Sequence, residues 1–187
     1  MCGIAGIISL DGSNVVDGSI RVKKMLENMS YRGPDGKGVY VDDSKKVVLG
    51  NNRLAITDPH FKLNGPLALE NNNLVMSFNG EIYDYGQQKI NLENSGVTIR
   101  SQTDTEVLMQ GIKNKGMSFL DQVDGCWAFA LLNKYENKLT ISRDILGEKQ
   151  IFFFKNNKEF VFSSEVYSLL SILNKKIEIN ILELISS

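Results

Sequence analysis

The second residue of the chain has the clearest capacity for chemistry. Cys2 directly follows Met1, and its side chain is small enough to permit removal of the initiator methionine. Removal leaves a cysteine whose free α-amine has an ordinary pKa of about 7.7–8, so the amine accepts a proton near neutral pH. A thiol and a base on one residue form a nucleophile–base pair that needs no histidine. Taken by itself, Cys2 is explained more simply as a small apolar residue that leads into a strand.

The scarcity of cysteine and histidine argues against several other kinds of site. The chain has two cysteines, Cys2 and Cys126, and one histidine, His60. A structural zinc ion takes four such ligands, so neither a zinc site nor a disulfide framework is expected. Any triad that relies on histidine must use His60, which lies in a polar loop and receives no role. Cys126 precedes a tryptophan at the start of an apolar segment and is predicted to be a core residue.

Polar residues at three further places each have an ordinary structural explanation. Arg53 has the planar fork that suits a carboxylate, although a surface ion pair is its default explanation. Asn79 and Gly80 form a dipeptide typical of hairpin turns, and a turn also exposes hydrogen-bond donors. Asp104 belongs to a helix capping box, and Glu81 by itself indicates a solvated loop charge.

Short strands and a few helices must position these residues. Apolar patterning predicts strands at 4–10, 38–42, 46–50, 53–57, 74–79 with a continuation at 82–83, 127–132, 138–143, 151–155 and 160–163. Helices are predicted at 17–29, 86–94, 104–114 and 164–173. Asp17 or Ser19 is expected to cap the first helix, and a capping box at 103–106 the third. Many strands without regular βαβ alternation indicate an α+β fold with antiparallel sheets.

Composition narrows the class of protein. The 187 residues, 42% of them hydrophobic, predict one globular domain. Lys plus Arg total 21 and Asp plus Glu 22, and this balance gives no sign of a nucleic-acid or anionic-membrane partner. No apolar run reaches the length of about 20 residues that a membrane helix needs. No secretory signal is visible at the N-terminus, so a cytoplasmic location is expected.

Eight motifs occur together over nearly the whole chain. They are Met-Cys-Gly-Ile-Ala-Gly-Ile (1–7), Tyr-Arg-Gly-Pro-Asp-Gly (31–36), Asn-Arg-Leu-Ala-Ile-Thr-Asp (52–58), Phe-Asn-Gly-Glu-Ile-Tyr-Asp (78–84), Thr-Asp-Thr-Glu-Val (103–107), Asp-Gly-Cys-Trp-Ala-Phe-Ala (124–130), Arg-Asp-Ile-Leu-Gly (143–147) and Ser-Ser-Glu (163–165). In this order they resemble the glutaminase domain of class II glutamine amidotransferases, whose nucleophile is the N-terminal residue. Within that group the chain is most similar to the domain that opens asparagine synthetases.

The resemblance implies both a fold and a reaction. The fold is a four-layer αββα sandwich of two antiparallel sheets between helical layers, that of N-terminal nucleophile hydrolases. Residues 2–173 would form this domain, and 174–187 a tail or the start of a synthetase domain that this sequence lacks. The reaction is hydrolysis of L-glutamine to glutamate and ammonia, without metal or cofactor. A synthetase domain or separate subunit, which alone would use ATP and magnesium, would turn aspartate into asparagine. A homodimer is left open.

The resemblance also assigns site residues. Cys2 would be the nucleophile, with Asn79 and Gly80 as the oxyanion hole. Arg53 would hold the α-carboxylate of glutamine. The other implied residues bind the substrate α-ammonium or line the pocket: Glu81 and Asp104 for the first task, and Leu54, Ile56 and Thr57 for the second.

Some positions depart from the family pattern. Asn52 stands where family members often have His, Asp84 where they often have Asn, and Gln150 where they have Pro. The last change lies in the region expected near the synthetase, so it bears on partner docking and on the ammonia acceptor. Arg32 and Asp35, in contrast, match the family and are interpreted as residues that organise their loop.

Two alternatives stay open from the sequence. The first is a glutaminase of the same superfamily that serves another acceptor. The second is a regulatory or scaffolding domain that keeps the fold without activity. If Met1 is retained, the α-amine of Cys2 is locked in a peptide bond and the proposed base is lost.

Overall fold

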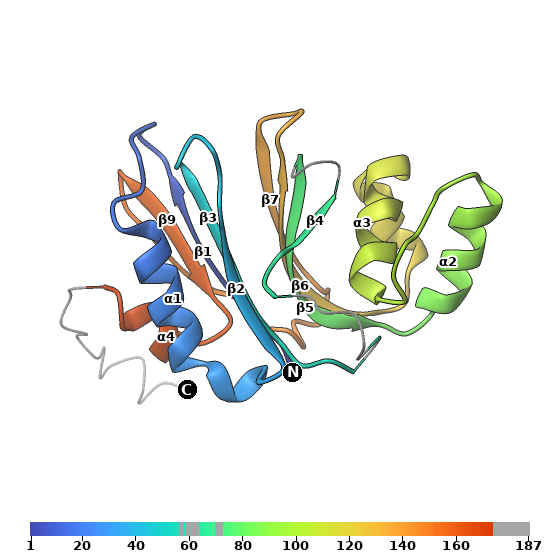
Figure 1. The fold of residues 1–187 in the computed structure, drawn as a ribbon, viewed down its shortest axis with the longest axis horizontal. Helices are drawn as coiled ribbons and strands as arrows, with labels where there is room; N and C mark the ends of the chain where they lie inside the picture. The colour runs from blue at the N-terminus through green and yellow to red at the C-terminus, as the bar shows by residue number, and fades with distance from the viewer. Residues whose placement is uncertain (57, 59–63, 70–72, 174–187) are drawn as a thin grey trace.

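The computed structural model describes residues 1–56, 58, 64–69 and 73–173 (Figure 1). Thr57, His60 and the predicted tail at 174–187 lie outside the described residues. No helix in the described part is long and apolar enough to cross a bilayer.

In the described part of the chain, nine strands form two antiparallel sheets. The first has the order β2-β3-β1-β9-β8, made of β1 (Gly3–Ser9), β2 (Gly36–Val41), β3 (Val47–Arg53), β8 (Phe152–Lys155) and β9 (Glu159–Ser163). The second has the order β4-β5-β6-β7, made of β4 (Leu67–Leu69), β5 (Leu74–Ile82), β6 (Gly125–Asn133) and β7 (Lys138–Arg143). The predicted antiparallel α+β class is confirmed.

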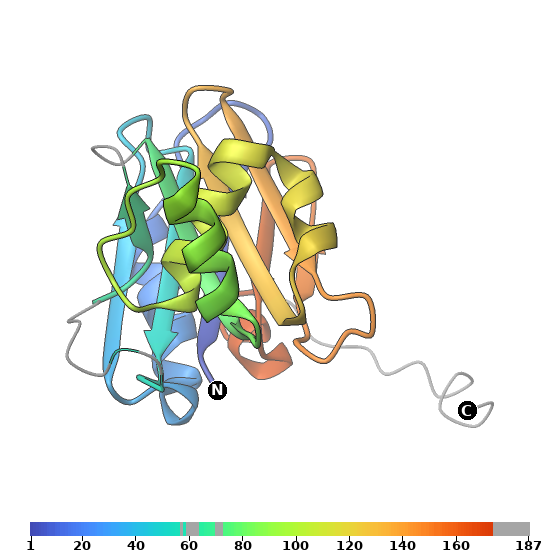
Figure 2. The ribbon, with the colours of Figure 1, turned by 90° about the vertical axis from the view of Figure 1, so that its right-hand side faces the viewer.

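Helices cover the two outer faces of this pair of sheets. On the first sheet lie α1 (Gly18–Asn28) and α4 (Val166–Leu170), and on the second lie α2 (Tyr85–Asn94) and α3 (Asp104–Lys115) (Figures 1 and 2). Two short 3₁₀ helices, η1 (Ser30–Arg32) and η2 (Met117–Gln122), join these elements. The expected four-layer αββα sandwich is therefore confirmed.

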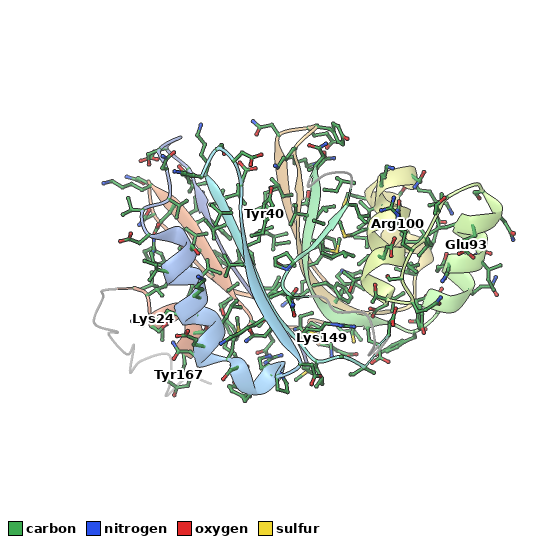
Figure 3. The ribbon with its side chains drawn as sticks, in the orientation of Figure 1. Lys24, Tyr40, Glu93, Arg100, Lys149 and Tyr167 are labelled. Atoms are coloured by element: carbon green, nitrogen blue, oxygen red, sulfur yellow. The ribbon has the colours of Figure 1, made fainter. Side chains whose placement is uncertain are left out.

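Side chains from alternate strand positions fill the three spaces between the layers (Figure 3). In β1, Ala5 and Ile7 pack with α1, whereas Ile4 points to the opposite face and packs against the second sheet. In β6, Phe129 packs with α3, and the small Ala128 and Ala130 face the first sheet. Both faces of the inner strands are thus buried, which explains why their sequences are continuously apolar.

The Asn79-Gly80 dipeptide does not form the hairpin turn that its sequence predicts. Both residues lie inside β5, and they pair with Ala128 and Trp127 of β6 in a register that continues unbroken to Ile82. Pairing over nine residues outweighs the local turn preference of Asn-Gly.

Other local predictions were partly wrong. Of the predicted strand 53–57, Arg53 is the last residue of β3 and residues 54–56 form no strand. Strand β4 was not predicted. The last helix is α4 alone, shorter than the predicted 164–173. Asp17 occupies the N-cap of α1 in a left-handed conformation, without a side-chain capping bond.

The predicted capping box of α3 is half formed. The hydroxyl of Thr103 accepts a hydrogen bond from Glu106 N at 3.3 Å. The Glu106 carboxylate does not return to Thr103, and instead accepts from the backbone N–H groups of Arg100 and Ser101 at 2.9 and 2.7 Å. It therefore fixes the chain that leads into α3 and so helps to place Asp104.

Candidate active site

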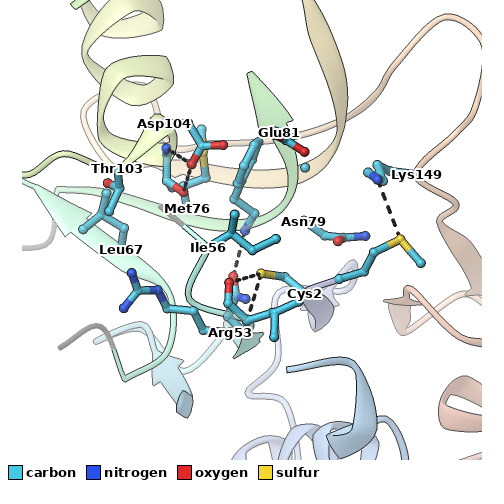
Figure 4. A pocket seen from close by; sticks show the side chains of 16 residues that line it. Cys2, Arg53, Ile56, Leu67, Met76, Asn79, Glu81, Thr103, Asp104 and Lys149 are labelled. Carbon is cyan, nitrogen blue, oxygen red and sulfur yellow. Dashed lines mark hydrogen bonds between the residues drawn. The ribbon is translucent and has the colours of Figure 1, made fainter. Parts of the chain in front are cut away.

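A pocket at the N-terminal end of β1 brings together residues that are far apart in sequence (Figure 4). Eight of the nine predicted site residues line it: Cys2, Arg53, Leu54, Ile56, Asn79, Gly80, Glu81 and Asp104. The ninth, Thr57, lies outside the described residues. The pocket thus joins the start of β1, the end of β3, the second half of β5 and the N-terminus of α3.

The Cys2 side chain is held by the segment that follows β3. Leu54 N donates a hydrogen bond to Cys2 Sγ at 3.3 Å, and the thiol faces Leu54 O at 3.8 Å. Burial raises the pKa of the Cys2 thiol, although the Leu54 N–H and the charge of the N-terminal amine act in the opposite direction. With Met1 in place, Cys2 is therefore a thiol at neutral pH and needs a base to react.

Arg32 fixes the backbone of the same residue. Its Nε donates to Cys2 O at 2.9 Å, and its guanidinium forms an ion pair with Glu165. Asp35, in the same loop, accepts a hydrogen bond from Ala55 N at 2.8 Å. The loop therefore holds Cys2 and the pocket wall together, in agreement with the organising role expected from the sequence.

Asn79 presents a buried donor to the pocket. Its side chain is 1% exposed, and its Nδ2 has no hydrogen-bond partner among the described residues. Leaving a buried amide unpaired costs about 1–3 kcal/mol, so the position calls for a ligand. The adjoining Gly80 lets the strands approach, since a Cβ there would lie 2.5 Å from Cys126 O. An amide donor beside a thiol is the arrangement that an oxyanion hole requires.

Charges of opposite sign lie on different walls of the pocket. Arg53 lies at the end of β3, where its Nη2 donates to Asp58 O at 2.8 Å. Asp104 is 5% exposed and accepts from Thr105 N at 2.8 Å and from Ile82 N at 3.3 Å. Glu81 is an exposed second carboxylate on the same pocket. The Arg53 guanidinium suits the α-carboxylate of a free amino acid, and the two carboxylates suit its α-ammonium.

Asn51 is a pocket residue that sequence reasoning missed. Its Oδ1 accepts from Phe78 N at 2.8 Å, and its Nδ2 donates to Gly3 O at 3.4 Å. It thereby ties the strand of Cys2 to the strand of Asn79. Nothing distinguished it from the adjacent Asn52, which is buried on the helical side and donates to Leu26 O and Met29 O at 2.7 and 3.0 Å.

Lys149 is a second missed residue of the pocket lining. The Asp144 carboxylate accepts from the N–H groups of Glu148 and Lys149 at 2.9 and 3.0 Å and so holds their turn. Burial alone would raise the pKa of Asp144, but these backbone donors outweigh it and lower the pKa. Asp144 belongs to the Arg-Asp-Ile-Leu-Gly motif, but the sequence did not indicate that the turn after this motif reaches Met1.

Cys126 does not belong to the pocket lining. It is buried in β6, and its sulfur accepts a hydrogen bond from Tyr83 Oη at 3.3 Å. The prediction that it is a core residue is confirmed.

Within the described ranges, no group of three or more His, Cys, Asp or Glu side chains is placed to hold a metal ion.

A family model and two curated relatives place the chain in the same family. A family model described as a glutamine amidotransferase domain matches residues 1–186. The chain is 35% identical over 174 residues to an asparagine synthetase [glutamine-hydrolyzing] of Bacillus subtilis, and covers 22% of that protein with 91% of its own length. It is 34% identical over 200 residues to a putative asparagine synthetase [glutamine-hydrolyzing] of Methanocaldococcus jannaschii, with coverage of 37% and 96%. The chain thus spans less than two fifths of either relative.

A solved structure shares the fold. Glutamine phosphoribosylpyrophosphate amidotransferase from B. subtilis superposes with a TM-score of 0.73 and 20% sequence identity. The match covers 91% of this chain and 43% of that one. This chain therefore has the fold of that amidotransferase domain.

Proposed function

Because this chain belongs to the glutamine amidotransferase domain family, we propose that it hydrolyses L-glutamine to glutamate and ammonia in the pocket that contains Cys2. The observation that carries the proposal is the meeting of the Cys2 thiol with the unpartnered, buried amide of Asn79. Arg53 binds the α-carboxylate of glutamine, and Glu81 and Asp104 bind its α-ammonium. Leu54 and Ile56 form the wall along the substrate, and the same role is proposed for Thr57, which lies outside the described residues.

The proposed reaction begins after Met1 is removed. The Cys2 α-amine, directly or through a water, accepts the thiol proton, and the sulfur attacks the side-chain carboxamide carbon. Asn79 Nδ2 and Gly80 N–H stabilise the oxyanion of the tetrahedral intermediate. The C–N bond breaks as the ammonium returns its proton to the leaving nitrogen, which departs as ammonia. Water then attacks the thioester with the amine as base, and releases glutamate and the free thiol.

Every group needed for this hydrolysis comes from the chain, so the proposal uses no cofactor. The direct test is release of glutamate and ammonia from L-glutamine by protein that begins at Cys2. Asparagine is the matched control, because its amide is one methylene too short to reach the sulfur when Arg53 holds its carboxylate. Release from glutamine alone supports the proposal. Absence of release from fully processed protein contradicts it and favours a regulatory or scaffolding domain.

We further propose that the ammonia serves asparagine synthesis. Support comes from the two glutamine-hydrolysing asparagine synthetases, which are much longer than the stretch that this chain matches. A synthetase domain or separate subunit would consume aspartate, ATP and magnesium ions. A reducing cytoplasm would suit this chemistry because Cys2 must stay a free thiol. Glutamine-dependent asparagine formation, when the chain is supplied with the synthetase part of the B. subtilis relative, tests the acceptor independently of glutamate release.

Asn79→Ala should slow turnover while leaving substrate binding intact. Loss of one oxyanion donor typically costs about 10²–10³ in rate. Steady-state kinetics should show this loss in kcat, with KM for glutamine changed only a few-fold. Asn91→Ala, on the exposed side of α2, is the matched control and should behave as wild type. A wild-type kcat for Asn79→Ala would remove Asn79 from the oxyanion hole.

Arg53→Gln should have the opposite kinetic signature. Loss of a charged hydrogen bond to a carboxylate costs about 1.5–3 kcal/mol, which corresponds to about 10–100-fold in KM. Arg53→Lys should recover part of this loss, since it restores the charge without the fork. Because Arg53 also donates to Asp58 O, thermal unfolding of each variant checks that the pocket wall persists. An unchanged KM for Arg53→Gln would place the substrate carboxylate elsewhere.

A further inference from the structure

Two cations flank the residue that processing removes. Lys149 Nζ lies 3.7 Å from Met1 Sδ (Figure 4). Arg32 Nη2 lies 3.9 Å from the same sulfur. A thioether is only a weak acceptor, so the contact with Met1 does not explain why a lysine points here. Once Met1 departs, the lysine ammonium and the new α-amine of Cys2 both face the pocket that Met1 had lined.

The position of this ammonium is built into the fold. The turn that carries Lys149 is held by the Asp144 carboxylate, which is buried. Arg32 is neutralised by its ion pair with Glu165. Lys149, in contrast, is half-buried and forms no ion pair with any carboxylate of the described residues. Its charge therefore acts on the pocket, where Glu81 and Asp104 are the opposing carboxylates.

The charges that face the mature terminus oppose one another. Six charged side chains line the pocket or hold its rim: Arg32, Arg53, Lys149, Glu81, Asp104 and Glu165. Glu81 and Asp104, which the substrate α-ammonium requires, also favour a protonated Cys2 amine. A protonated amine cannot accept the thiol proton. An additional cation near the amine counteracts this effect.

We propose that Lys149 is a positioning residue that keeps the mature Cys2 amine–thiol pair in its reactive, singly deprotonated state. The inference rests on the proposed glutaminase function and extends it. Because the amine and the thiol titrate as a coupled pair, a nearby cation promotes loss of the first proton whichever group gives it up. The acid limb of the pH–rate profile reports that proton.

The pH dependence of kcat/KM tests this role with three variants. Lys149→Gln should move the acid limb upward by about half a pH unit, which lowers the rate about 3-fold below the limb. Lys149→Arg keeps the charge and should restore the wild-type limb. Lys158→Gln, an exposed lysine in the turn between β8 and β9, is the matched control and should leave it unchanged. An unmoved limb for Lys149→Gln, or a rise in KM alone, would overturn the inference.

A second readout does not depend on turnover. In a Cys126→Ala background, the rate of Cys2 alkylation by iodoacetamide is followed against pH on protein whose Met1 has been removed. The pH at which the alkylation rate is half-maximal should be higher for Lys149→Gln and should return to the wild-type value for Lys149→Arg. Equal midpoints in wild type and both variants contradict the inference. Failure of wild type to release glutamate would instead reject the proposed function, and the alkylation midpoints still decide the role of Lys149.

Discussion

Replacement of Cys2 by alanine is expected to lower glutamate release by at least about 10⁴-fold. The change removes the sulfur that forms the covalent bond to substrate, and no other described residue of the pocket lining carries a thiol. Thr103 and Thr105 also reach the lining, but Thr103 caps α3 and Thr105 contacts Asp104. The measurement is glutamate release from glutamine by processed protein at neutral pH.

The second cysteine provides the control for this experiment. Cys126→Ala removes a buried sulfur that does not line the pocket, so it should lower the unfolding temperature slightly and leave turnover near that of wild type. Cys2→Ala should keep its unfolding temperature, because alanine nearly preserves the volume at the start of β1. Equal glutamate release by wild type and Cys2→Ala would discard the catalytic role of Cys2.

Retention of Met1 should be almost as damaging as loss of the sulfur. A peptide nitrogen is not a base, and the Met1 residue itself lines the pocket. Burial raises the pKa of the Cys2 thiol above its ordinary value of 9.0, so without the α-amine little thiolate exists at pH 7. Protein that starts at Met1 is therefore expected to be at least about 10³-fold less active than protein that starts at Cys2.

Two preparations that differ only in this residue test the expectation. A cleavable leader placed before Met1 or before Cys2 yields each chain, and intact mass confirms the terminus. Activity of the Met1-retaining protein should rise only at pH values above the ordinary thiol pKa of 9.0, because burial raises the pKa of Cys2 and hydroxide must then replace the missing base. Equal activity of the two preparations at pH 7 would remove the α-amine from the mechanism.

Regular patterning made most of the fold predictable. The alternation in β1 and the continuous apolar run in β6 indicated strands correctly, because both segments are buried between other layers. The predicted turn at Asn79-Gly80 was wrong because pairing between strands overrode the local preference of this dipeptide. Hydrogen bonds to β6 determine the conformation here, and the sequence of β5 alone does not show which strand pairs with it.

The residues of the pocket were predictable only where a motif named them. Cys2, Arg53, Asn79 and Asp104 each had an ordinary structural explanation, and the family resemblance joined them before the fold placed them on one pocket. The sequence analysis assigned no role to Lys149 or Asn51. Their importance depends on a turn that returns to Met1 and on hydrogen bonds between two sheets, which are three-dimensional relations.

The most direct measurement is mass spectrometry of the N-terminal peptide after acid quench during glutamine turnover. The mechanism predicts a peptide that begins at Cys2 and carries a γ-glutamyl group as a thioester on that sulfur. The adduct should be absent from Cys2→Ala and should accumulate only while glutamine remains. A fully active protein whose N-terminal peptide still begins at Met1, or whose glutamyl group resides on another residue, would contradict it.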